Sequence, residues 1–499
     1  MKSIRRTVVI GAGVGGLAAS IDLARSGCDV TLIERAEYVG GKLRSLSPQN
    51  RAIDAGPTVF TMRHVFESLF ADAGRRLEDE LRLYPASLLA RHIWSHDPAV
   101  LDLHADPRRS MEAIGDFAGA REARGFREFL DRAGALHDCL REPFMMSPRP
   151  TTTGLMREIG FAGMLAMWRT PPWLTLWRAL AAHFRDPRLR QLFARYATYV
   201  GSSPLQAPAT LMLIAHVEQS GVWLVEGGMR RVAAALAALA THCGANLRLG
   251  NGVRRIEVRD GRIAGVHLDD GDFIAADTVV FNGDTQALAD GLLGEELRPA
   301  VASRGRSERG LSAVTWCVDA PTEGFDLAHH NVFFGDDYPR EFADIFEQRT
   351  ITTQPTIYVC AQDRGEASTP LRAGDAERLL ILVNAPADGD QRGITDSELA
   401  ALEQRVFLQL ETSGLLVSRQ PERIDVTRPQ DFARLFPATG GSLYGSANHG
   451  AFASFARPNA RTHIPGLYLA GGSVHPGPGV PMATLSGRLA AACLLRDLA

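Results

Sequence analysis

The chain has 499 residues, of which 45% are hydrophobic, and its 54 Lys and Arg against 57 Asp and Glu give a net charge of −3. This length predicts two or three domains rather than a single core. The near-neutral charge and the lack of a basic cluster interleaved with aromatic residues argue against nucleic-acid binding. The six cysteines are scattered without a C-x-x-C pair, which predicts reduced thiols in a cytosolic protein.

The stretch from Thr7 to Glu34 carries the strongest pattern in the chain. Val8–Ile10 form an apolar run typical of a strand buried on both faces, and the sequence Gly-Ala-Gly-Val-Gly-Gly follows directly. A helical pattern then leads to a second buried strand that ends in Glu34. This order of strand, glycine turn, helix and strand is typical of a dinucleotide-binding unit.

The glycines of this turn have distinct expected roles. Gly11 permits the tight turn, Gly13 lets a pyrophosphate approach the backbone, and Gly16 lets the helix pack close to the strand. The helix N-terminus offers free N–H groups and a partial positive charge to the pyrophosphate. Glu34 stands where a carboxylate binds ribose hydroxyls, which disfavours the 2′-phosphate of NADP, so the site is expected to hold FAD or NAD.

The N-terminal residues imitate a signal peptide, because two arginines precede the apolar run. Cleavage would remove the strand that the glycine turn requires. We therefore expect a mature N-terminus and a protein that is not exported.

Two further glycine-rich segments follow and are interpreted as cofactor loops. In the first, Gly40–Ser45, Lys42 and Arg44 can face phosphates or the edge of a ring. The second, Asp54–Thr58, follows a short strand. Each is an ordinary loop when taken alone, and their position directly after the glycine turn favours the cofactor role.

Residues 64–208 are predicted to be largely helical. Within them, Phe161–Phe184 is strongly apolar and contains Trp168, Trp173 and Trp177, but two arginines and a Pro-Pro break exclude a membrane span. Two interpretations stay open. The segment is either a pair of core helices or an interfacial segment whose Trp and Arg side chains sit at a bilayer surface.

The next two regions alternate strands and helices. Residues 221–284 read as an addition to the first domain, with a helix at Met229–Ala240 and Val253 placed to hold an adenine through its backbone. Their expected strands are Asn246–Leu249, Val253–Val258, Ile263–Leu268 and Thr278–Phe281. Residues 285–436 indicate a second sheet, with strands at Ser312–Val318, Thr356–Cys360, Leu379–Val383 and Arg423–Val426 and a helix at Glu398–Leu410.

The chain ends with a buried strand, a Gly/Pro-rich loop and a helix. The strand is Leu467–Ala470, and the loop turns into a helix near Pro481, a favoured first helical residue. A second helix N-terminus aimed at a flavin would stabilise the negative charge that develops on the ring when it is reduced. NAD needs no such helix, so this ending favours FAD.

These motifs, with the Glu-Gly-Gly-Met stretch at 226–229 and Ala276–Asp284, resemble those of the phytoene-desaturase-type carotenoid oxidoreductases. That family belongs to a wider group of FAD-dependent amine oxidases and GDP-dissociation-inhibitor-like flavoproteins. Three further stretches, His330–Tyr338, Thr356–Arg364 and Leu443–Gly450, are similar to the 1-hydroxycarotenoid 3,4-desaturases of the hydroxyneurosporene and methoxyneurosporene type. The resemblance covers essentially the whole chain.

The resemblance implies an α/β (α+β) fold: a Rossmann-type FAD-binding domain (1–63, 221–284 and 437–499), a helical membrane-facing subdomain (64–220) and a substrate domain built on a second sheet (285–436). It implies a tunnel that opens at a membrane, and hence a cytoplasmic protein peripherally associated with the inner membrane. The residues expected to bind FAD are Gly11, Ala12, Gly13, Gly15, Gly16, Glu34, Arg35, Gly41, Lys42, Arg44, Gly56, Pro57, Val253, Gly471, Gly472, Val480, Pro481 and Met482.

The expected reaction is desaturation of a CH2–CH2 unit at C3–C4 of an acyclic 1-hydroxycarotenoid. Flavin N5 would accept the hydride, and oxygen or a quinone would reoxidise the flavin. The polyene delocalises the allylic cation, so no acid or base residue is assigned. His475 is more easily explained as a loop residue than as a base, and Asp337 and Arg364 either contact the substrate hydroxyl or form surface ion pairs.

No metal site is expected. His92 and His96 stand four apart, but the Asp97-Pro98 pair that follows breaks any helix there. The competing functions are a phytoene-type multistep desaturase, a carotenoid isomerase or retinol saturase relative, an amine oxidase and, without catalysis, an isoprenoid-binding carrier. The retained glycines and the closing loop favour a redox function over the carrier.

Overall fold

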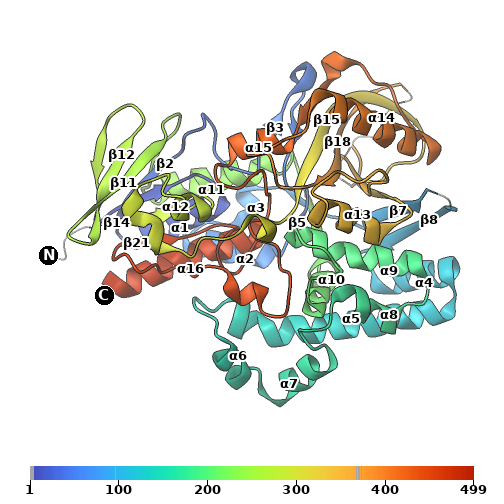
Figure 1. Cartoon of the computed structure of the whole chain (residues 1–499), viewed down its shortest axis with the longest axis horizontal. Helices are drawn as coiled ribbons and strands as arrows, with labels where there is room; N and C mark the ends of the chain where they lie inside the picture. The colour runs from blue at the N-terminus through green and yellow to red at the C-terminus, as the bar shows by residue number, and fades with distance from the viewer. Residues whose placement is uncertain (1–4, 96, 367, 369–370, 373, 499) are drawn as a thin grey trace.

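The computed structural model describes residues 5–95, 97–366, 368, 371–372 and 374–498. Two sheets lie above a group of helices (Figure 1), and smaller sheets complete the fold. The mixed α/β class predicted from the sequence is confirmed.

The first sheet is parallel and has five strands in the order β10-β2-β1-β14-β21. Its strands come from three distant parts of the chain, and all five were predicted. They are β1 (Arg6–Ile10), β2 (Asp29–Ile33), β10 (Asn246–Arg248), β14 (Thr278–Phe281) and β21 (Leu467–Leu469).

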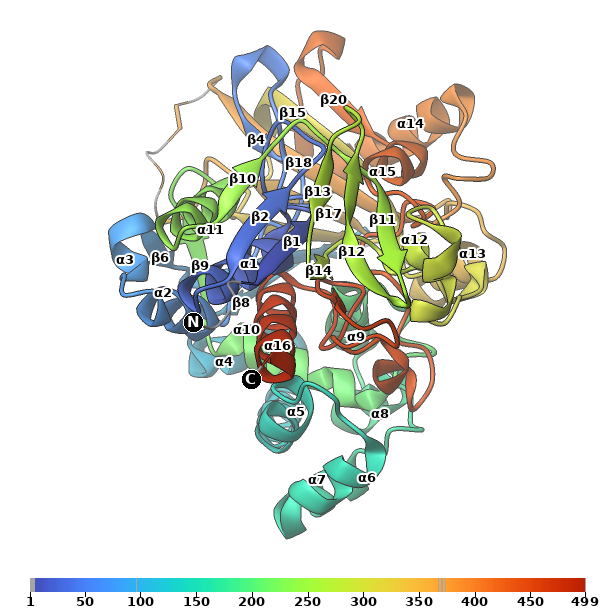
Figure 2. The same cartoon turned by 90° about the vertical axis from the view of Figure 1, so that its left-hand side faces the viewer.

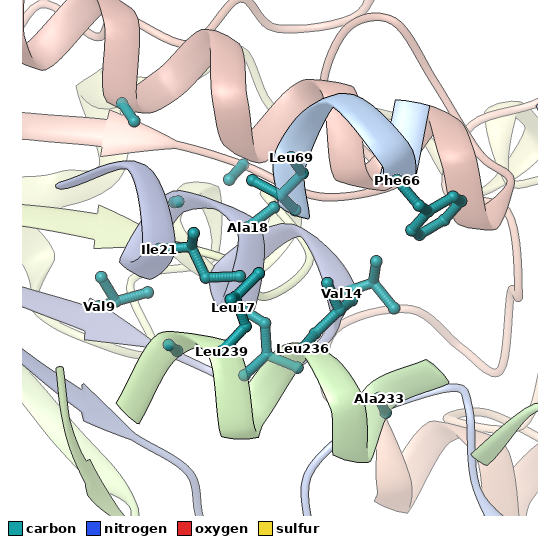
Figure 3. Packing of buried hydrophobic residues seen from close by; sticks show 14 of the residues in the cluster. Val9, Val14, Leu17, Ala18, Ile21, Phe66, Leu69, Ala233, Leu236 and Leu239 are labelled. Atoms are coloured by element: carbon teal, nitrogen blue, oxygen red, sulfur yellow. The ribbon is translucent and has the colours of Figure 1, made fainter. Parts of the chain in front are cut away.

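Helices cover one face of this sheet. Val9 of the central strand points into this helical layer, together with Leu17 and Leu236, and burying each such leucine stabilises the fold by roughly 1.5–3 kcal/mol (Figure 3). The layer consists of α1 (Val14–Arg25), α2 (Arg63–Asp72), α11 (Arg230–His242) and α16 (Val480–Leu498).

A three-stranded antiparallel meander covers the other face (Figure 2). Because side chains alternate along a strand, Val8 and Ile10 point to this side and pack against Ile256 and Val266. The meander consists of β11 (Val253–Arg259), β12 (Arg262–Leu268) and β13 (Phe273–Ala275). The predicted hairpin at Asp260 and Gly261 is confirmed, with φ of 49° and 72° at these two residues.

The second sheet is mixed and has eight strands. One face packs against α14 (Asp396–Thr412), with Trp316, Val318 and Leu402 in the shared core. Its strands are β7 (Leu88–Trp94), β8 (Asp97–His104), β15 (Ser312–Gly324), β16 (His330–Phe334), β17 (Ile357–Ala361), β18 (Ala376–Ala385), β19 (Leu415–Val417) and β20 (Ile424–Thr427).

Strands β7 and β8 were not predicted, because residues 64–208 were read as largely helical. β7 pairs in parallel with β16, from which it is far apart in the sequence. Arg91 sits in β7, and its charge is neutralised by Asp102 on the adjacent β8, with both donor–acceptor distances 2.8 Å. His92 is a buried residue of β7 whose Nδ1 lies 3.1 Å from the Leu101 carbonyl oxygen. His96 lies outside the described residues.

The helical group lies below the second sheet (Figure 1). Its core contains a cluster of four contacting aromatic rings, those of Phe126, Phe129, Phe184 and Phe193. Its helices are α4 (Pro107–Ala118), α5 (Ala120–Leu140), α8 (Leu176–His183), α9 (Pro187–Ala194) and α10 (Leu213–Gln219). Two more helices, α6 (Thr152–Glu158) and α7 (Gly160–Arg169), project from it (Figure 2). Within the described ranges, none of the helices combines the length and apolar composition needed to cross a bilayer.

The remaining elements are short. The helices are α3 (Leu77–Glu80), α12 (Gln286–Ala289), α13 (Tyr338–Phe346) and α15 (Pro429–Leu435). The strands are β3 (Ser45–Leu46), β4 (Ile53–Asp54), β5 (Phe60–Thr61), β6 (Leu83–Pro85) and β9 (Val222–Val225).

Candidate flavin and substrate site

A cavity of about 1420 Å³ is lined by residues from both sheets and from the helical group. Small-molecule pockets are commonly roughly 300–1,000 Å³, so this space is large enough for more than one ligand. All the residues predicted to hold the dinucleotide line it, except Ala12 and Gly16. These two residues are buried.

The glycine turn at the end of β1 forms one end of the cavity. A Cβ on Gly16 would lie 2.1 Å from the Gly11 carbonyl oxygen, so only glycine fits where α1 crosses the turn. The Glu34 carboxylate accepts hydrogen bonds from the backbone N–H of Ala12 at 2.8 Å and of Ala36 at 2.9 Å. These two bonds hold the carboxylate at the cavity edge, where its remaining lone pairs can accept hydroxyl groups.

The glycine-rich segment Gly40–Ser45 places two cations on the cavity wall. Lys42 Nζ donates to the Leu443 carbonyl oxygen at 2.6 Å, and burial lowers the Lys42 pKa to about 8. Arg44 donates to Thr427 Oγ1 at 2.8 Å, and burial lowers its pKa. A Cβ on Gly56 would lie 1.8 Å from the Lys42 carbonyl oxygen, so the two loops touch where this glycine stands.

The closing loop and α16 supply a second helix N-terminus. Gly471, Gly472 and Val480–Met482 line the cavity. A Cβ on Gly487 would lie 2.0 Å from the Gly15 carbonyl oxygen, so α16 and α1 are in backbone contact where they cross. The N-termini of α1 and α16 therefore both open onto the cavity, and each offers unpaired N–H groups to an anionic or electron-rich ligand.

Comparison with known proteins decides the family. Residues 14–495 match the model of the flavin containing amine oxidoreductases. The chain belongs to this family. It is 52% identical to a hydroxyneurosporene desaturase of Rubrivivax gelatinosus over 99% of this chain and 94% of the relative, and 46% identical to a hydroxyneurosporene desaturase of Cereibacter sphaeroides over 99% and 98%. An oxidoreductase from Methanosarcina mazei has the same fold, with a TM-score of 0.60, 16% identity and coverage of 97% and 99%.

A flavin fits the residues found here. The cavity has a glycine cradle at one end, where a Cβ on Gly41 would lie 3.3 Å from Gly13 Cα. It also has a fixed carboxylate, two cations and two helix N-termini, which together match a ribose, a pyrophosphate and an electron-accepting ring. The chain is therefore a flavin-dependent oxidoreductase, and the end of the cavity between the first sheet and α16 is its candidate flavin site.

Away from the flavin site, the cavity reaches the projecting helices α6 and α7. Met156, Met164, Trp168 and Trp173 line it and are also exposed to solvent, the two tryptophans at 77% each. Trp177 differs, since it packs 4.7 Å from the Arg190 guanidinium and 6.3 Å from the Tyr338 ring. The apolar segment is thus divided: α8 belongs to the core, whereas α7 is exposed.

A third part of the cavity is polar. Arg195 Nη1 donates to Tyr199 Oη at 3.2 Å, and Tyr199 Oη donates to Glu218 Oε1 at 3.0 Å. The Tyr358 ring lies 5.3 Å from the Arg195 guanidinium, and the Tyr358 hydroxyl is 2.7 Å from Thr58 Oγ1. This polar cluster therefore adjoins the Gly56-Pro57 loop of the flavin site.

The polar residues singled out from the sequence lie elsewhere. His475 is buried outside the cavity lining, and its Nε2 lies 2.9 Å from the Phe144 carbonyl oxygen. Burial lowers its pKa to about 4, so it is neutral at pH 7. Asp337 caps α13 by accepting from the Arg340 N–H at 3.0 Å, and Arg364 is paired with Glu377 at 2.8 Å. Both residues have structural partners and neither lines the cavity.

Two groups of possible metal ligands occur among the described residues. His329, His330 and Cys360 lie close together, as do His137, Asp138 and His216. In the first group, burial lowers the pKa of both histidines and raises that of the Cys360 thiol, which keeps the sulfur protonated and a poor ligand.

Sequence reasoning missed several cavity residues. Asn282 and Asp284 could have been found, because they follow the carboxyl end of a buried strand, where ligands of parallel sheets bind. Arg195, Tyr199 and Glu218 carry no comparable signal, since each looks like an ordinary helical surface residue until the chain is folded.

Proposed function

We propose that this chain is an FAD-dependent carotenoid desaturase that forms the C3–C4 double bond of acyclic 1-hydroxycarotenoids. The observation that carries the proposal is the full-length similarity to two hydroxyneurosporene desaturases at 52% and 46% identity. The cavity supports it, because its walls beyond the flavin site are mostly Leu, Ile, Met, Phe and Trp side chains that suit a long polyene.

FAD is the proposed form of the flavin. Glu34 would accept the ribose hydroxyls, Gly13 and the α1 N-terminus the pyrophosphate, and Val253 the adenine through its backbone. The α16 N-terminus at Val480 would face the ring. The other predicted flavin contacts fit the same position, since Lys42, Arg44 and the Gly56-Pro57 loop line the space between these two ends.

The bound flavin supplies the hydride acceptor, and oxygen or a quinone is the proposed final electron acceptor. The chain's own contribution is to hold the substrate's CH2–CH2 unit against the ring and to exclude water. Leu380 and Leu382, two residues apart on β18, present their side chains to the cavity from the same face of the second sheet.

Membrane contact is part of the proposal. The exposed apolar side chains of α6 and α7 border the cavity, so a polyene could pass from a bilayer to the flavin without crossing water. Residues 141–178 contain five arginines and two glutamates, a balance that favours an anionic membrane surface. We therefore propose a peripheral protein of the cytoplasmic face of the inner membrane.

We propose a different role for each of the three parts into which the sequence divides the chain. Residues 1–63, 221–284 and 437–499 hold the flavin, residues 64–220 meet the membrane, and residues 285–436 form the substrate wall. Residues 88–104 contribute two strands to the second sheet, so the middle segment also supports the substrate wall.

The test is anaerobic mixing of the flavin-loaded protein with an acyclic 1-hydroxycarotenoid and with the same carotene lacking the hydroxyl. Flavin bleaching together with a red-shifted polyene spectrum for the hydroxylated compound is the expected result. A parallel reaction with phytoene completes the test, and turnover of phytoene alone would overturn the 3,4-desaturase and favour the multistep desaturase. Bleaching with neither compound would favour the isomerase or carrier.

A further inference from the structure

The polar cluster stands out because it brings charge into a part of the cavity whose walls are mostly apolar. Among the described residues that line the cavity, Arg195 and Glu218 are the charged side chains outside the flavin site. Burying charge beside a polyene is costly unless the charge meets a partner. A plain hydrocarbon offers no such partner, so this cluster needs a polar group on the ligand.

Most N–H donors of the Arg195 guanidinium have no recorded hydrogen-bond partner among the described residues. In the described part of the chain, the hydrogen bond recorded for its guanidinium goes from Nη1 to Tyr199 Oη. A guanidinium carries five N–H donors, and the side chain faces the cavity. Tyr196 and Tyr199 both donate to Glu218, which fixes the carboxylate and, through Tyr199, the position of Arg195.

Three described residues that line the cavity, Thr315, Tyr338 and Asn448, have a buried polar atom without a hydrogen-bond partner, and Tyr338 is the one that interacts with Arg195. The Tyr338 side chain is only 3% exposed and lines the cavity, yet its hydroxyl has no hydrogen-bond partner among the described residues. It lies within electrostatic range of Arg195 and Tyr199. A buried hydroxyl without a partner is rare in folded proteins, and one that faces a ligand cavity points to a bond made by the ligand.

Two contacts connect the polar cluster to the Gly56-Pro57 loop of the candidate flavin site. Arg195 packs on Tyr358, and the Tyr358 hydroxyl is bonded to Thr58, which directly follows the Gly56-Pro57 flavin loop. Carbon 1 and carbon 4 of the substrate are joined by three bonds of about 1.5 Å each. A hydroxyl on carbon 1 that is held at this cluster therefore leaves the C3–C4 unit close to the flavin loop.

We propose that Arg195 and Tyr338 bind the tertiary 1-hydroxyl of the substrate, with Tyr199 and Glu218 as positioning residues, and that this subsite selects hydroxylated carotenoids. Arg195 donates to the hydroxyl oxygen, and the hydroxyl proton is donated to the Tyr338 oxygen. The inference rests on the proposed function and deepens it, because it explains why C3–C4, rather than another bond of the chain, faces the flavin.

The test compares Tyr338→Phe and Arg195→Met with the wild type on a matched pair of acyclic carotenoids, with and without the 1-hydroxyl. Tyr338→Phe removes a hydroxyl that has no protein partner, so the fold should be unaffected. We expect kcat/KM for the hydroxylated substrate to fall about threefold to tenfold in Tyr338→Phe and about tenfold to a hundredfold in Arg195→Met. The rate with the plain carotene should fall by less than the rate with the hydroxylated one, so the preference between the two substrates should narrow.

Tyr84→Phe is the matched control. Its hydroxyl donates to Glu226 at 2.7 Å, outside the cavity lining, so the same chemical change there should leave the preference intact. A second readout is the equilibrium affinity of the flavin-loaded protein for each carotenoid, measured from the polyene absorption under anaerobic conditions.

The outcomes distinguish a failure of the proposed subsite from a failure of the proposed reaction. Loss of the preference for the hydroxylated substrate in both variants would support the subsite. An equal change for both substrates in both variants would overturn it and leave the desaturase proposal standing. If the wild type acted on neither carotenoid, the proposed function would fail and the subsite with it.

Discussion

Asn282 Nδ2 donates a hydrogen bond to the Gly11 carbonyl oxygen at 3.0 Å, which ties the end of β14 to the first glycine of the flavin turn. The same side chain is so close to the turn that a Cβ on Gly13 would lie 2.9 Å from Nδ2 and one on Gly15 would lie 2.6 Å from Oδ1. The neighbouring Asn282 side chain alone thus favours glycine at positions 13 and 15.

This packing predicts the effect of adding one methyl group to α1. In Gly16→Ala, the new Cβ would collide with the Gly11 carbonyl oxygen and push α1 away from β1. We expect purified Gly16→Ala to be largely colourless and destabilised by about 2 kcal/mol or more, as overpacked sites are. Flavin absorbance after gel filtration and urea unfolding measure the two effects.

Gly115→Ala is the control, since Gly115 lies in α4 and its Cβ would meet only Ala123 Cβ, at 3.6 Å. Alanine is the better helix former, so this variant should be as yellow as the wild type and more stable by about 0.5–1 kcal/mol. A colourless Gly115→Ala would show that flavin loss does not report on the turn.

The anchoring of Glu34 predicts a second effect on the cofactor. Both carboxylate oxygens accept backbone N–H groups, so in Glu34→Gln one of them would be replaced by an amide donor that faces another donor. We expect flavin affinity to fall about tenfold or more, measured by fluorescence titration of the stripped protein. Glu37→Gln changes a nearby exposed carboxylate outside the cavity lining and should have no effect.

The sequence was sufficient to predict the parts of the fold whose signal is local. The turn from Gly11 to Gly16 and the strands beside it form one continuous stretch, so their pattern predicts both the fold and the flavin end of the cavity. The strand ending in Phe281 was predicted from its apolar run. Asn282 follows this strand and belongs to the Ala276–Asp284 stretch that carries the family resemblance. The sequence did not predict that its side chain would contact the glycine turn.

The remaining features depend on distant contacts. β7 contains Arg91 and His92, which weaken the pattern of a buried strand, and its partner β16 is remote in the sequence. The polar cluster draws Arg195, Glu218 and Tyr338 from three helical elements, and no local pattern marks any of them as a cavity residue. For the apolar segment around Trp173, the sequence left open whether it is core or interfacial, and only the fold separates its exposed part from its core part.

The buried His475 predicts a component of acid unfolding. Burial lowers its pKa to about 4 in the folded protein, against about 6.5 when unfolded, so the unfolded chain binds more protons between these values. The contribution of the neutral, buried His475 to the free energy of unfolding is therefore fully present above pH 6.5 and is lost as the pH falls towards 4.

His475→Gln keeps an N–H that can donate to the Phe144 carbonyl oxygen but cannot take up a proton. Between pH 7 and pH 5, the wild type should lose about 2 kcal/mol more of its free energy of unfolding than the variant does. Other buried histidines are common to both proteins and cancel in this difference. Parallel pH profiles for the two proteins would contradict the burial argument, and His463→Gln, at an exposed site, should follow the wild type.

The division of the Trp-rich segment predicts how the protein binds to a membrane. Trp168 and Trp173 are exposed and border the cavity, whereas Trp177 packs against Arg190 and Tyr338 and should not be used to test docking. We expect the double variant Trp168→Ser, Trp173→Ser to bind vesicles of anionic phospholipid about tenfold or more weakly, because each tryptophan loses most of the apolar area it could bury. Its melting temperature should stay close to that of the wild type, since exposed side chains contribute little to the core.

The control is Phe273→Ser, which removes an exposed aromatic ring from the meander on the far side of the first sheet and should bind vesicles like the wild type. Unchanged vesicle binding by the double variant would exclude α7 and the turn after it as the membrane contact and leave Trp168 and Trp173 as part of the cavity wall alone.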